Sequence, residues 1–535
     1  MNNKSLLKSS TVMAVGTIVS RITGLARGLL LVAVLGTTLL GDTFNVANTM
    51  PNILYNLIIG GALTAVFVPQ IVRSTNDSDG GSAFISRLVT ATSVFLGALV
   101  VISVLFAPVL VRIFATSYVG RPEFEVTTQF MRYCLPQIFF MGLFALLGQV
   151  ANAKGKFGPM MWAPVLNNLI AIGVFGWFLK YSTQPTVATI PTSQIIWIGL
   201  GSTAGYIAQA FILIPVISKT NIKIRLRFDW RDSELRKSVH LATWTLAFAA
   251  ISQISYLVTV NLSTGAAVKS LKAGIETGVG FTPFSNALLI FMLPHSIITI
   301  SVMTALLPTL SRFAHEKKPA LIHDQLVKAM RIVGLITVPS AIAFLLFGPL
   351  ITGSLFFGIT SADSDYLGYT LSALALGLMP MSVNLIALRG LNAFENVKLQ
   401  VLSNAIMNAI GIVASIAVVF VLPAEWVTVG LAGALAFSYY FGTWNTIRAL
   451  RKFEINISIS EVFGFYTKLA SLALSVAVPV WLLRNSIPGG NFLRLIIVFA
   501  LCGAGYLALC KIARVGEITS AVEVLLRRGK DRVAK

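Results

Sequence analysis

The sequence predicts an all-α integral membrane protein of about fourteen transmembrane helices, arranged as two parallel six-helix repeats plus two C-terminal helices around a central cavity. Of its 535 residues, 56% are hydrophobic and 11% are charged, whereas a soluble chain carries roughly 25% charged residues. Runs without Asp, Glu, Lys or Arg recur along the chain, long enough for the ~20 residues that cross a ~30 Å hydrocarbon core. The runs are continuous and lack the alternation of a transmembrane β-barrel.

The first apolar run follows Lys4 and Lys8 and is too long for the core of a signal peptide. It also lacks a convincing small-residue cleavage site, so we expect the first helix to stay attached. The expected spans are 10–35, 43–71, 88–111, 133–153, 157–179, 195–218, 241–264, 281–311, 332–358, 367–388, 399–421, 427–447, 465–483 and 495–512.

The basic residues alternate between the two ends of these spans. With a cytoplasmic N-terminus, 31 of the 41 Lys and Arg residues fall on the cytoplasmic side and only 8 on the other. Such a bias predicts a multi-pass protein with an even number of spans and both termini cytoplasmic. The net charge of +21 therefore reports topology and does not indicate nucleic-acid binding. The densest basic segment is 219–237, and we expect the stretch after Asp229, Trp230–His240, to form an interfacial helix against anionic headgroups.

An internal repeat relates the two halves of the chain. Four short matches recur in the same order at spacings of 236 to 241 residues: Pro69 with Pro308, Pro108 with Pro349, Asn152 with Asn392, and Asn168 with Asn404. Because six helices separate the matches, the repeat is parallel, and two such lobes enclose a cavity that opens to either side by rocking. We therefore expect a transporter with lobes at 1–220 and 221–455, a helix pair at 456–515 and a basic tail at 516–535.

Two arginines inside the first helix are the strongest candidates for a site. If this helix begins near Ser10, Arg21 lies ~16 Å along it, a depth at which a guanidinium must face protein or a wet cavity. Arg27 follows ~9 Å further on and ~120° around the helix, a spacing suited to a diphosphate, whose oxygens match the guanidinium fork. The alternatives are snorkelling, which suits Arg27 better than Arg21, and an ion pair with Asp42.

Asp42 opens the second helix and has two interpretations. It is either the N-cap of that helix or a group that pairs with an arginine in one conformational state and releases it in the other. Polar residues inside later spans also have two interpretations, namely hydrogen bonds between helices or a monovalent-cation site without a carboxylate. These residues are Asn261, Asn404, Asn408 and Thr443.

Signatures of enzymes and metal sites are absent from the sequence. There is no GxxxxGK[ST], HExxH or GxSxG motif, and the three cysteines have neither disulfide nor metal-ligand spacing. The glycine-rich segment Gly199–Gly205 lies inside an expected helix, where it favours close helix packing. His295 follows Pro294, and we expect it to be packed beside a kink. We therefore predict no catalytic residue and no metal ligand.

Several segments resemble the MurJ/MviN lipid II flippase family, a branch of the multidrug/oligosaccharidyl-lipid/polysaccharide exporter superfamily. The matching segments are Ser20-Arg21-x-x-Gly24-x-x-Arg27, Asp42-x-Phe44, Pro51-Asn52, Gly61-Ala62 and Phe67-Val68-Pro69. An actinobacterial member is the nearest fit. The resemblance implies that Arg21, Arg27 and Asp42 contact the substrate or its gate. We expect Asn52 and Asn56 to join them, and the last two helices to form a groove for a polyprenyl tail.

The resemblance also implies a function. Members move lipid II, an undecaprenyl-diphosphate-linked disaccharide-pentapeptide, from the inner to the outer leaflet by alternating access for cell-wall synthesis. The expected partners are lipid II, membrane lipids and other cell-wall synthesis proteins, without nucleic acid. No cofactor is expected, and a monovalent cation or the membrane potential would supply the drive. This chain departs from the family at Leu288–Leu289, where many members carry an arginine, and it lacks acidic sodium ligands.

Three other functions fit parts of the pattern. An exporter of another polyprenyl-linked glycan or of a drug would use the same fold. A polyprenyl-dependent membrane glycosyltransferase also has many helices, but it usually needs a substantial external loop, and the external connections here are short. A pure scaffold would leave Arg21 without a purpose. Lipid II flipping without covalent chemistry accounts for the arginines, the repeat and the two extra helices together.

Overall fold

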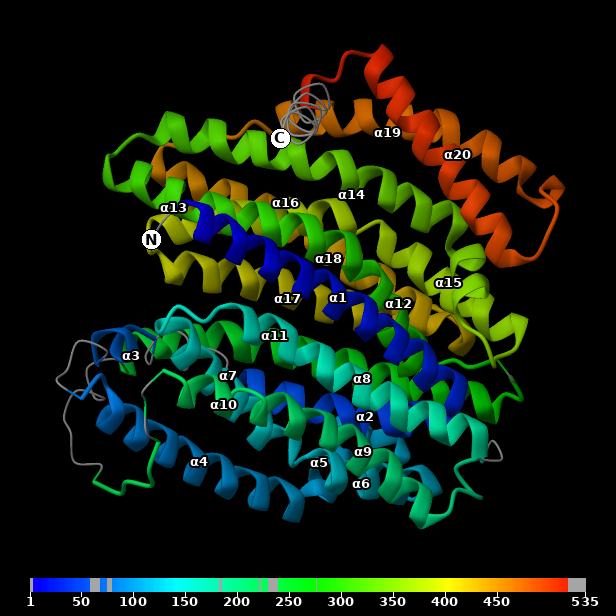
Figure 1. Cartoon of the computed structure of the whole chain (residues 1–535). Coiled ribbons are helices and arrows are strands. Elements are labelled where there is room, and N and C mark those ends of the chain that lie inside the picture. The colour runs from blue at the N-terminus through cyan, green and yellow to red at the C-terminus, as the bar shows by residue number, and fades with distance from the viewer. Residues whose placement is uncertain are drawn as a thin grey trace. The chain divides into compact units, whose positions relative to one another are not determined.

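The computed structural model describes residues 3–57, 68–74, 79–181, 185–220, 222, 224–229, 239–275 and 277–517. Within these ranges every regular element is a helix (Figure 1), which confirms the predicted fold class. The chain divides into two compact units, and each is described by itself. Unit 1 comprises Met1–Ser285 and Val419–Thr428, and unit 2 comprises Asn286–Val418 and Val429–Lys535.

Unit 1 contains eleven α-helices in its described residues and the first turn of a twelfth. They are α1 (Asn3–Leu35), α2 (Leu39–Tyr55), α3 (Val68–Ser74), α4 (Ser82–Leu105), α5 (Ala107–Phe114), α6 (Pro122–Cys134), α7 (Gln137–Ala153), α8 (Gly158–Tyr181), α9 (Thr192–Phe211), α10 (Ile214–Ser218), α11 (Val239–Lys272) and the start of α12 (Phe281–Pro294). The helix α1 packs along α8, α8 along α9, and α2 against α6 and α7.

Unit 2 is built around its longest helix. Its elements are the rest of α12, a π-helical turn (His295–Thr299), α13 (Ile300–His315), α14 (Pro319–Leu355), α15 (Ser361–Ala375), α16 (Leu378–Ala393), all but the end of α17 (Val397–Val421), all but the start of α18 (Val427–Leu450), α19 (Ile459–Leu483) and α20 (Asn491–Ile512). The helix α14 contacts α13, α15, α16, α19 and α20. In Figure 1, α19 and α20 lie side by side along α14.

Eleven helices in the described residues are long and apolar enough to cross a membrane, and the bent pair α15 and α16 would make a twelfth span. Two expected spans fall short of this test. The helix α2 has only 17 residues, and α18 has 24 residues but carries many polar and small ones. The count of fourteen stays a prediction, whereas a multi-pass membrane protein is confirmed.

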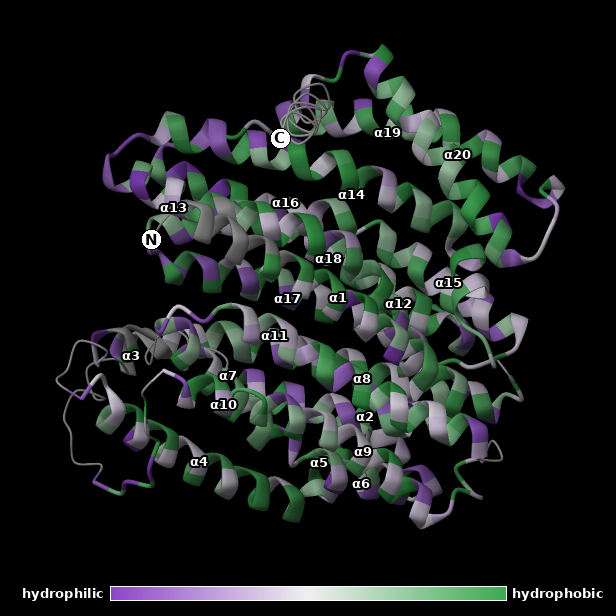
Figure 2. Ribbon diagram, viewed as in Figure 1, coloured by the Kyte–Doolittle hydropathy of each residue, from purple (hydrophilic) through white to green (hydrophobic). Residues whose placement is uncertain are grey.

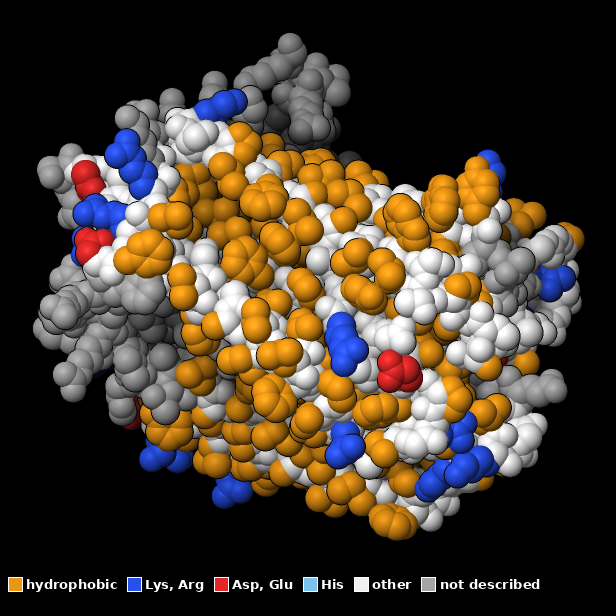
Figure 3. Space-filling model, turned by 90° about the horizontal axis from the view of Figure 1, so that it is seen from below, with side chains coloured by type: hydrophobic (Ala, Val, Ile, Leu, Met, Phe, Trp, Pro, Cys, Tyr) orange, Lys and Arg blue, Asp and Glu red, His pale blue; other side chains and the backbone are white. Residues whose placement is uncertain are grey.

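The distribution of polar residues agrees with a membrane environment. Figure 2 shows hydrophobic residues along most of each helix and hydrophilic residues gathered towards helix ends and connections. The face in Figure 3 is covered largely by hydrophobic side chains, with most of its Lys and Arg towards the edges. Such a surface is costly in water and favourable in lipid.

The helix α11, which the sequence assigns to the second lobe, belongs to unit 1. It contacts α2 and α5. The lobe boundaries, the parallel repeat and the central cavity stay predictions. The interfacial helix expected at Trp230–His240 lies almost wholly outside the described residues.

The glycine-rich segment in α9 does serve close packing, as expected from the sequence. A Cβ on Gly199 would lie 2.6 Å from Tyr133 Cβ on α6, and one on Gly201 would lie 2.5 Å from Val174 on α8. Three helices therefore approach each other closely at α9. The thiols Cys134 and Cys510 are buried and unpaired, in keeping with packing roles.

Candidate functional site

Asp42 joins the start of α2 to the start of α12. Its Oδ2 accepts a hydrogen bond from the backbone N–H of Phe281 (2.9 Å), and its Oδ1 accepts one from Thr282 N–H (2.6 Å). The side chain of Asn45, one turn along α2, donates to Thr282 Oγ1 (2.9 Å). The carboxylate is fully buried, and it satisfies two of the free amides at a helix N-terminus, where negative charge is favoured.

This geometry corrects one interpretation of Asp42. The N-cap of α2 is Thr38, so Asp42 does not cap its own helix; it caps α12 instead. In this structure no ion pair joins Asp42 to an arginine among the described residues. The second interpretation, a contact that depends on conformational state, stays a prediction.

Glycines permit this junction. Gly36 has φ of +74° and ends α1 in the left-handed conformation that favours glycine. A Cβ on Gly41 would overlap the carbonyl oxygen of Gly36, and a Cβ on Gly280 would overlap Asp42 Oδ2. Gly280 also has φ of +150°, which L-residues with side chains rarely adopt. The close approach of α2 and α12 therefore depends on residues without side chains.

Arg21 and Arg27 both lie on α1. The apolar stretch of this helix runs from Val15 to Leu35, so its midpoint is Leu25. Arg27 is about 3 Å beyond the midpoint and Arg21 about 6 Å before it, at 1.5 Å per residue. Arg21 is exposed and Arg27 is half-buried within the structure. Within this stretch Arg27 lies nearer the midpoint than Arg21, and whether either arginine snorkels stays a prediction.

Two asparagines of α8 fix the part of α1 that carries Arg21. Asn168 Nδ2 donates to the carbonyl oxygen of Ser20 (3.0 Å) and lies 3.1 Å from Thr23 Oγ1. Asn167 Nδ2 donates to Gln209 Oε1 on α9 (3.0 Å). Polar residues inside an apolar helix are expected to form hydrogen bonds between helices, and both asparagines do so here. Their signal was an Asn pair inside an apolar run, which is costly unless hydrogen-bonded.

The other two residues predicted to bind substrate lie at the far end of α2 from Asp42. Asn52 is half-buried and Asn56 is exposed just after the helix. The Asn56 N–H donates to backbone carbonyl oxygens of α2. Their side chains are not brought to Asp42, because 10 and 14 residues of helix correspond to about 15 and 21 Å. Nothing in the geometry tests a role for either in binding.

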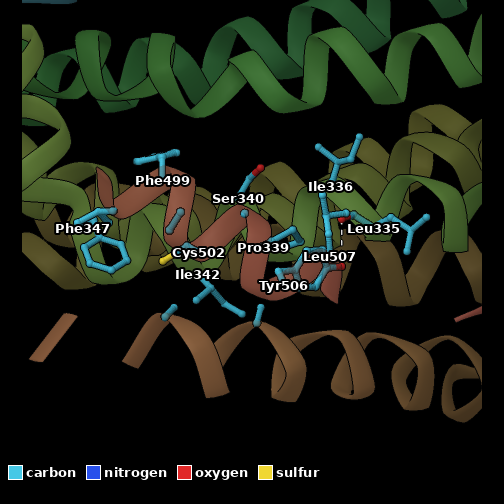
Figure 4. Close-up of a pocket in the computed structure, with 15 residues that line it drawn as sticks. Leu335, Ile336, Pro339, Ser340, Ile342, Phe347, Phe499, Cys502, Tyr506 and Leu507 are labelled. Carbon is cyan, nitrogen blue, oxygen red and sulfur yellow. Dashed lines mark hydrogen bonds between the residues drawn. The ribbon is translucent and has the colours of Figure 1, made fainter. Parts of the chain in front are cut away.

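An apolar groove runs between α14, α19 and α20 in unit 2 (Figure 4). Its volume is about 280 Å³, and its walls include Pro339, Phe347, Phe499 and Leu507. The Tyr506 hydroxyl at one end donates to the carbonyl oxygen of Leu335 (3.1 Å), and Figure 4 shows this bond as a dashed line. The Tyr506 hydroxyl is thereby satisfied internally, and apart from Ser340 and Cys502 the groove presents mainly hydrocarbon to an occupant.

The residues predicted as a polar network are separated into two groups. In unit 1, Asn261 Nδ2 on α11 donates to Ile113 O (3.0 Å) and lies 2.9 Å from Thr116 Oγ1. In unit 2, Asn408 Nδ2 lies 2.7 Å from Asn404 O and 2.9 Å from Asn404 Oδ1, all on α17. The contacts of Asn261 match the expected hydrogen bonds between helices, whereas the contacts of Asn408 lie within α17 itself. A cation role stays a prediction.

The last member of that predicted network, Thr443, lies on α18. Its Oγ1 is 2.7 Å from Pro380 O and 2.8 Å from Tyr439 O. His295 is buried in the π-helical turn with its Nδ1 3.0 Å from Ser382 Oγ, so it is packed as expected. Within the described ranges, no group of three or more His, Cys, Asp and Glu is arranged to hold a metal ion.

Comparisons with known proteins agree with one another. The family model described as lipid II flippase MurJ matches residues 31–502. A probable lipid II flippase MurJ from Vibrio cholerae is 26% identical over 432 residues, covering 76% of this chain and 78% of that protein. The corresponding Haemophilus influenzae protein is 24% identical over 486 residues, covering 87% and 90%. The actinobacterial assignment stays a prediction.

Solved structures show the same fold. A lipid II flippase MurJ in an inward closed conformation has a TM-score of 0.75 at 20% identity, covering 95% of this chain and all of that one. An inward-facing multidrug resistance transporter of the MATE family has a TM-score of 0.64 at 16% identity, covering 81% and 96%. Since the family model spans most of the sequence, this chain belongs to the lipid II flippase MurJ family.

Proposed function

We propose that this protein moves lipid II from the inner to the outer leaflet of the bacterial plasma membrane, by alternating access and without covalent chemistry. The observation that carries the proposal is the pair of arginines near the middle of α1. Neither Arg21 nor Arg27 forms an ion pair with a carboxylate in the described part of the chain. Two guanidiniums at that depth are costly unless an anion or water meets them.

The diphosphate of lipid II is a suitable anion. A guanidinium donates in a planar fork that matches two phosphate oxygens. Arg21 and Arg27 are ~9 Å apart along α1 and ~120° apart around it, so they are suited to contact different oxygens or successive positions of one headgroup. The hydrogen bonds from Asn168 to Ser20 O and Thr23 restrain α1 beside Arg21, which lowers the ordering cost of binding.

The apolar groove of α14, α19 and α20 suits the polyprenyl chain. A volume of about 280 Å³ is too small for the whole tail and fits a short segment of it, the rest lying in the bilayer. The lipid then has a polar headgroup bound by α1 and a tail held on a separate apolar surface. Helices α19 and α20 lie outside the predicted repeat, and in this proposal their role is to bind part of the polyprenyl tail.

We infer that the contact of Asp42 with α12 belongs to one state of the transport cycle. It consists of two hydrogen bonds at a helix N-terminus, so it breaks as a unit when the start of α12 moves away from α2. The drive for this movement, a monovalent cation or the membrane potential, is a further proposal. Lipid II transport in vesicles, measured with sodium replaced by choline while the membrane potential is held constant, shows which of the two drives the movement.

The direct test is transport of lipid II by the purified chain in vesicles, measured by the access of a membrane-impermeant reagent to each leaflet. We expect protein-dependent exposure in the second leaflet, and a loss of at least tenfold in Arg27→Ala. Arg132→Ala, which removes an exposed arginine of α6, is the matched control. Unchanged transport in Arg27→Ala, or no transport by the unaltered chain, would overturn the proposal.

A second candidate function is export of another polyprenyl-linked glycan or of a drug. This alternative is supported by the similarity of the fold to that of a MATE-family multidrug resistance transporter. Competition distinguishes the two: lipid II should be displaced by undecaprenyl-diphosphate lipids and not by lipophilic cations. Displacement by the cations alone would assign the protein to drug export.

A further inference from the structure

A second apolar hollow lies in unit 2 between α16, α18 and α19. Its volume is about 260 Å³, and it shares no residue with the groove of Figure 4. It is lined by Met379, Pro380, Val383, Tyr440, Thr443, Trp444, Ile447, Val462, Phe463, Tyr466, Thr467 and Ala470. Phe463 is 65% exposed and Trp444 50% exposed, so the hollow opens at the unit's surface. Sites for whole drug-sized ligands measure roughly 300–1,000 Å³, and this one suits a segment of a chain.

The hydroxyl groups along this hollow are already engaged with backbone carbonyls. The contacts are Tyr440 with Leu376 O (2.9 Å), Thr443 with Pro380 O (2.7 Å), Tyr466 with Met330 O (2.9 Å) and Thr467 with Gly464 O (2.9 Å). Each hydroxyl has one proton to donate, so none remains for an occupant. A polar group placed here would lose its own hydrogen bonds to water. The occupant of the hollow is therefore hydrocarbon.

A basic hollow adjoins the apolar one. It has a volume of about 210 Å³ and is lined by Trp444, Ile447, Arg448 and Arg451, the first two of which also line the apolar hollow. The Arg448 guanidinium lies 5.5 Å from the centre of the Trp444 ring. Both arginines are exposed, and neither pairs with a carboxylate in the part of the chain that the structure describes. Their charges are thus available to an anion beside the hydrocarbon slot.

The turn that carries Arg451 is held in place. Phe453 stacks on Phe394, the residue just after α16, with ring centres 4.3 Å apart, and the Glu454 N–H donates to Arg451 O (3.1 Å). The nearby carboxylate of Glu461 on α19 lies 3.5 Å from Arg331 of α14, so it is engaged there. Glu454, which ends the turn, is exposed and is not within ion-pair distance of either arginine. The backbone that carries Arg451 is therefore held, and the Arg448 guanidinium lies over Trp444, before any ligand arrives.

We propose that this composite site binds an anionic glycerophospholipid of the bilayer, such as phosphatidylglycerol. One acyl chain occupies the hollow of α16, α18 and α19, and the phosphodiester lies against Arg448 and Arg451, which donate charge-assisted hydrogen bonds to its oxygens. A zwitterionic lipid has the same phosphate but adds an ammonium or choline group that the two arginines repel. In the predicted orientation this end of α18 faces the cytoplasm, so the lipid belongs to the inner leaflet.

The test uses the purified, delipidated full chain and phosphatidylglycerol carrying a photoactivatable diazirine in one acyl chain. We expect crosslinks to peptides of α18 and α19. Unlabelled phosphatidylglycerol should compete at a concentration at least tenfold lower than phosphatidylcholine with the same chains. Crosslinks confined to α20 or to unit 1, or equal competition by the two lipids, would overturn the site. This readout requires no variant and no transport.

Variants then test the two parts of the site. The double change Arg448→Gln with Arg451→Gln should reduce the preference for phosphatidylglycerol to within twofold, and Thr467→Phe, which fills the hollow, should weaken binding of both lipids. The matched control is Arg484→Gln, since Arg484 also lies over a tryptophan, Trp481 (4.5 Å), but lines neither hollow. An unchanged preference in the double variant, or stronger competition by undecaprenyl phosphate than by phosphatidylglycerol, would contradict the proposal.

Discussion

Asp42 accepts a hydrogen bond of 2.6 Å from the backbone N–H of Thr282, although 240 residues separate the two in sequence. Both residues lie in the first turn of a membrane helix, α2 and α12 respectively. One buried carboxylate thus ties two distant helix starts together. Under the proposed alternating access, this tie breaks and re-forms during each transport cycle.

Replacing Asp42 by Asn tests the junction. The amide can keep one acceptor oxygen but must turn its NH2 group towards a backbone N–H, and the negative charge at the N-terminus of α12 is lost. We expect the free energy of unfolding to fall by on the order of 1–3 kcal/mol and lipid II transport to fall at least tenfold. Thermal unfolding in detergent and the vesicle assay measure these. Transport at the unaltered rate would show that the contact is structural only.

Gly280→Ala should have a similar effect by a different cause. The added Cβ would overlap Asp42 Oδ2, and the backbone conformation at Gly280 disfavours a side chain. The carboxylate must therefore move away from α12, and we expect reduced thermal stability together with reduced transport. Gly265→Ala on α11 is the control, because a Cβ there meets no atom within 4 Å. Equal behaviour of the two variants would contradict this account.

Asn168→Leu tests the positioning of Arg21. The change removes the hydrogen bonds to Ser20 O and Thr23 and keeps the number and branching of the side chain's heavy atoms. A loss of about 1–3 kcal/mol in stability is expected for a buried polar contact, with weaker binding of lipid II measured on the purified protein. Leu169→Ala, at a neighbouring position that is 51% exposed, should bind normally. If Asn168→Leu binds lipid II with unchanged affinity, α1 needs no support from α8.

Gly503→Phe tests the tail groove. Gly503 lines the groove, and a Cβ at this position meets no atom within 4 Å, so a phenyl ring would enter the groove without displacing the helices. Transport of lipid II with a full polyprenyl chain should fall several-fold, while an analogue with a short chain should be transported as before. Gly464→Phe on α19, also in open space, is the control. Equal loss for long and short chains would place the tail elsewhere.

Arg331→Ala should have a small effect on stability. Arg331 lies 3.5 Å from Glu461 and 3.6 Å from Glu517, with its side chain 35% exposed. Ion pairs at such accessible positions contribute about 1 kcal/mol or less and weaken with salt. We expect a fall of that size in low salt that disappears near 1 M salt, measured by thermal unfolding. A much larger loss of stability that does not depend on salt would mean that the ion pairs of Arg331 with Glu461 and Glu517 are shielded from solvent and contribute strongly to folding.

The sequence predicted the helical membrane fold because the composition and charges of each segment decide by themselves whether that segment lies in lipid. Apolar runs must be helical in lipid, where backbone groups have no other partners, so the runs located almost every helix. The helix breaks were harder to place. Examples are the π-helical turn after Pro294 and the bend between α15 and α16, at 44°, because these depend on packing against neighbouring helices.

Only part of the candidate site could be predicted from the sequence. Arg21 and Arg27 stood out because a charge in an apolar run is rare whatever surrounds it. Thr282 and Gly280 gave no comparable signal, since a threonine and a glycine at a helix start are ordinary. Their partner, Asp42, is 240 residues away, and no rule of local sequence connects them.

By itself the sequence thus determined that this chain is a multi-pass helical membrane protein with two arginines near the middle of its first helix. The tertiary structure alone decided that Asp42 caps α12 and not its own helix, that Asn168 restrains α1, and that Arg448 and Arg451 stand beside an apolar hollow. The physical reason is the range of the forces involved. Lipid burial is set residue by residue, whereas a hydrogen bond requires two groups within about 3 Å, which only the folded chain brings together.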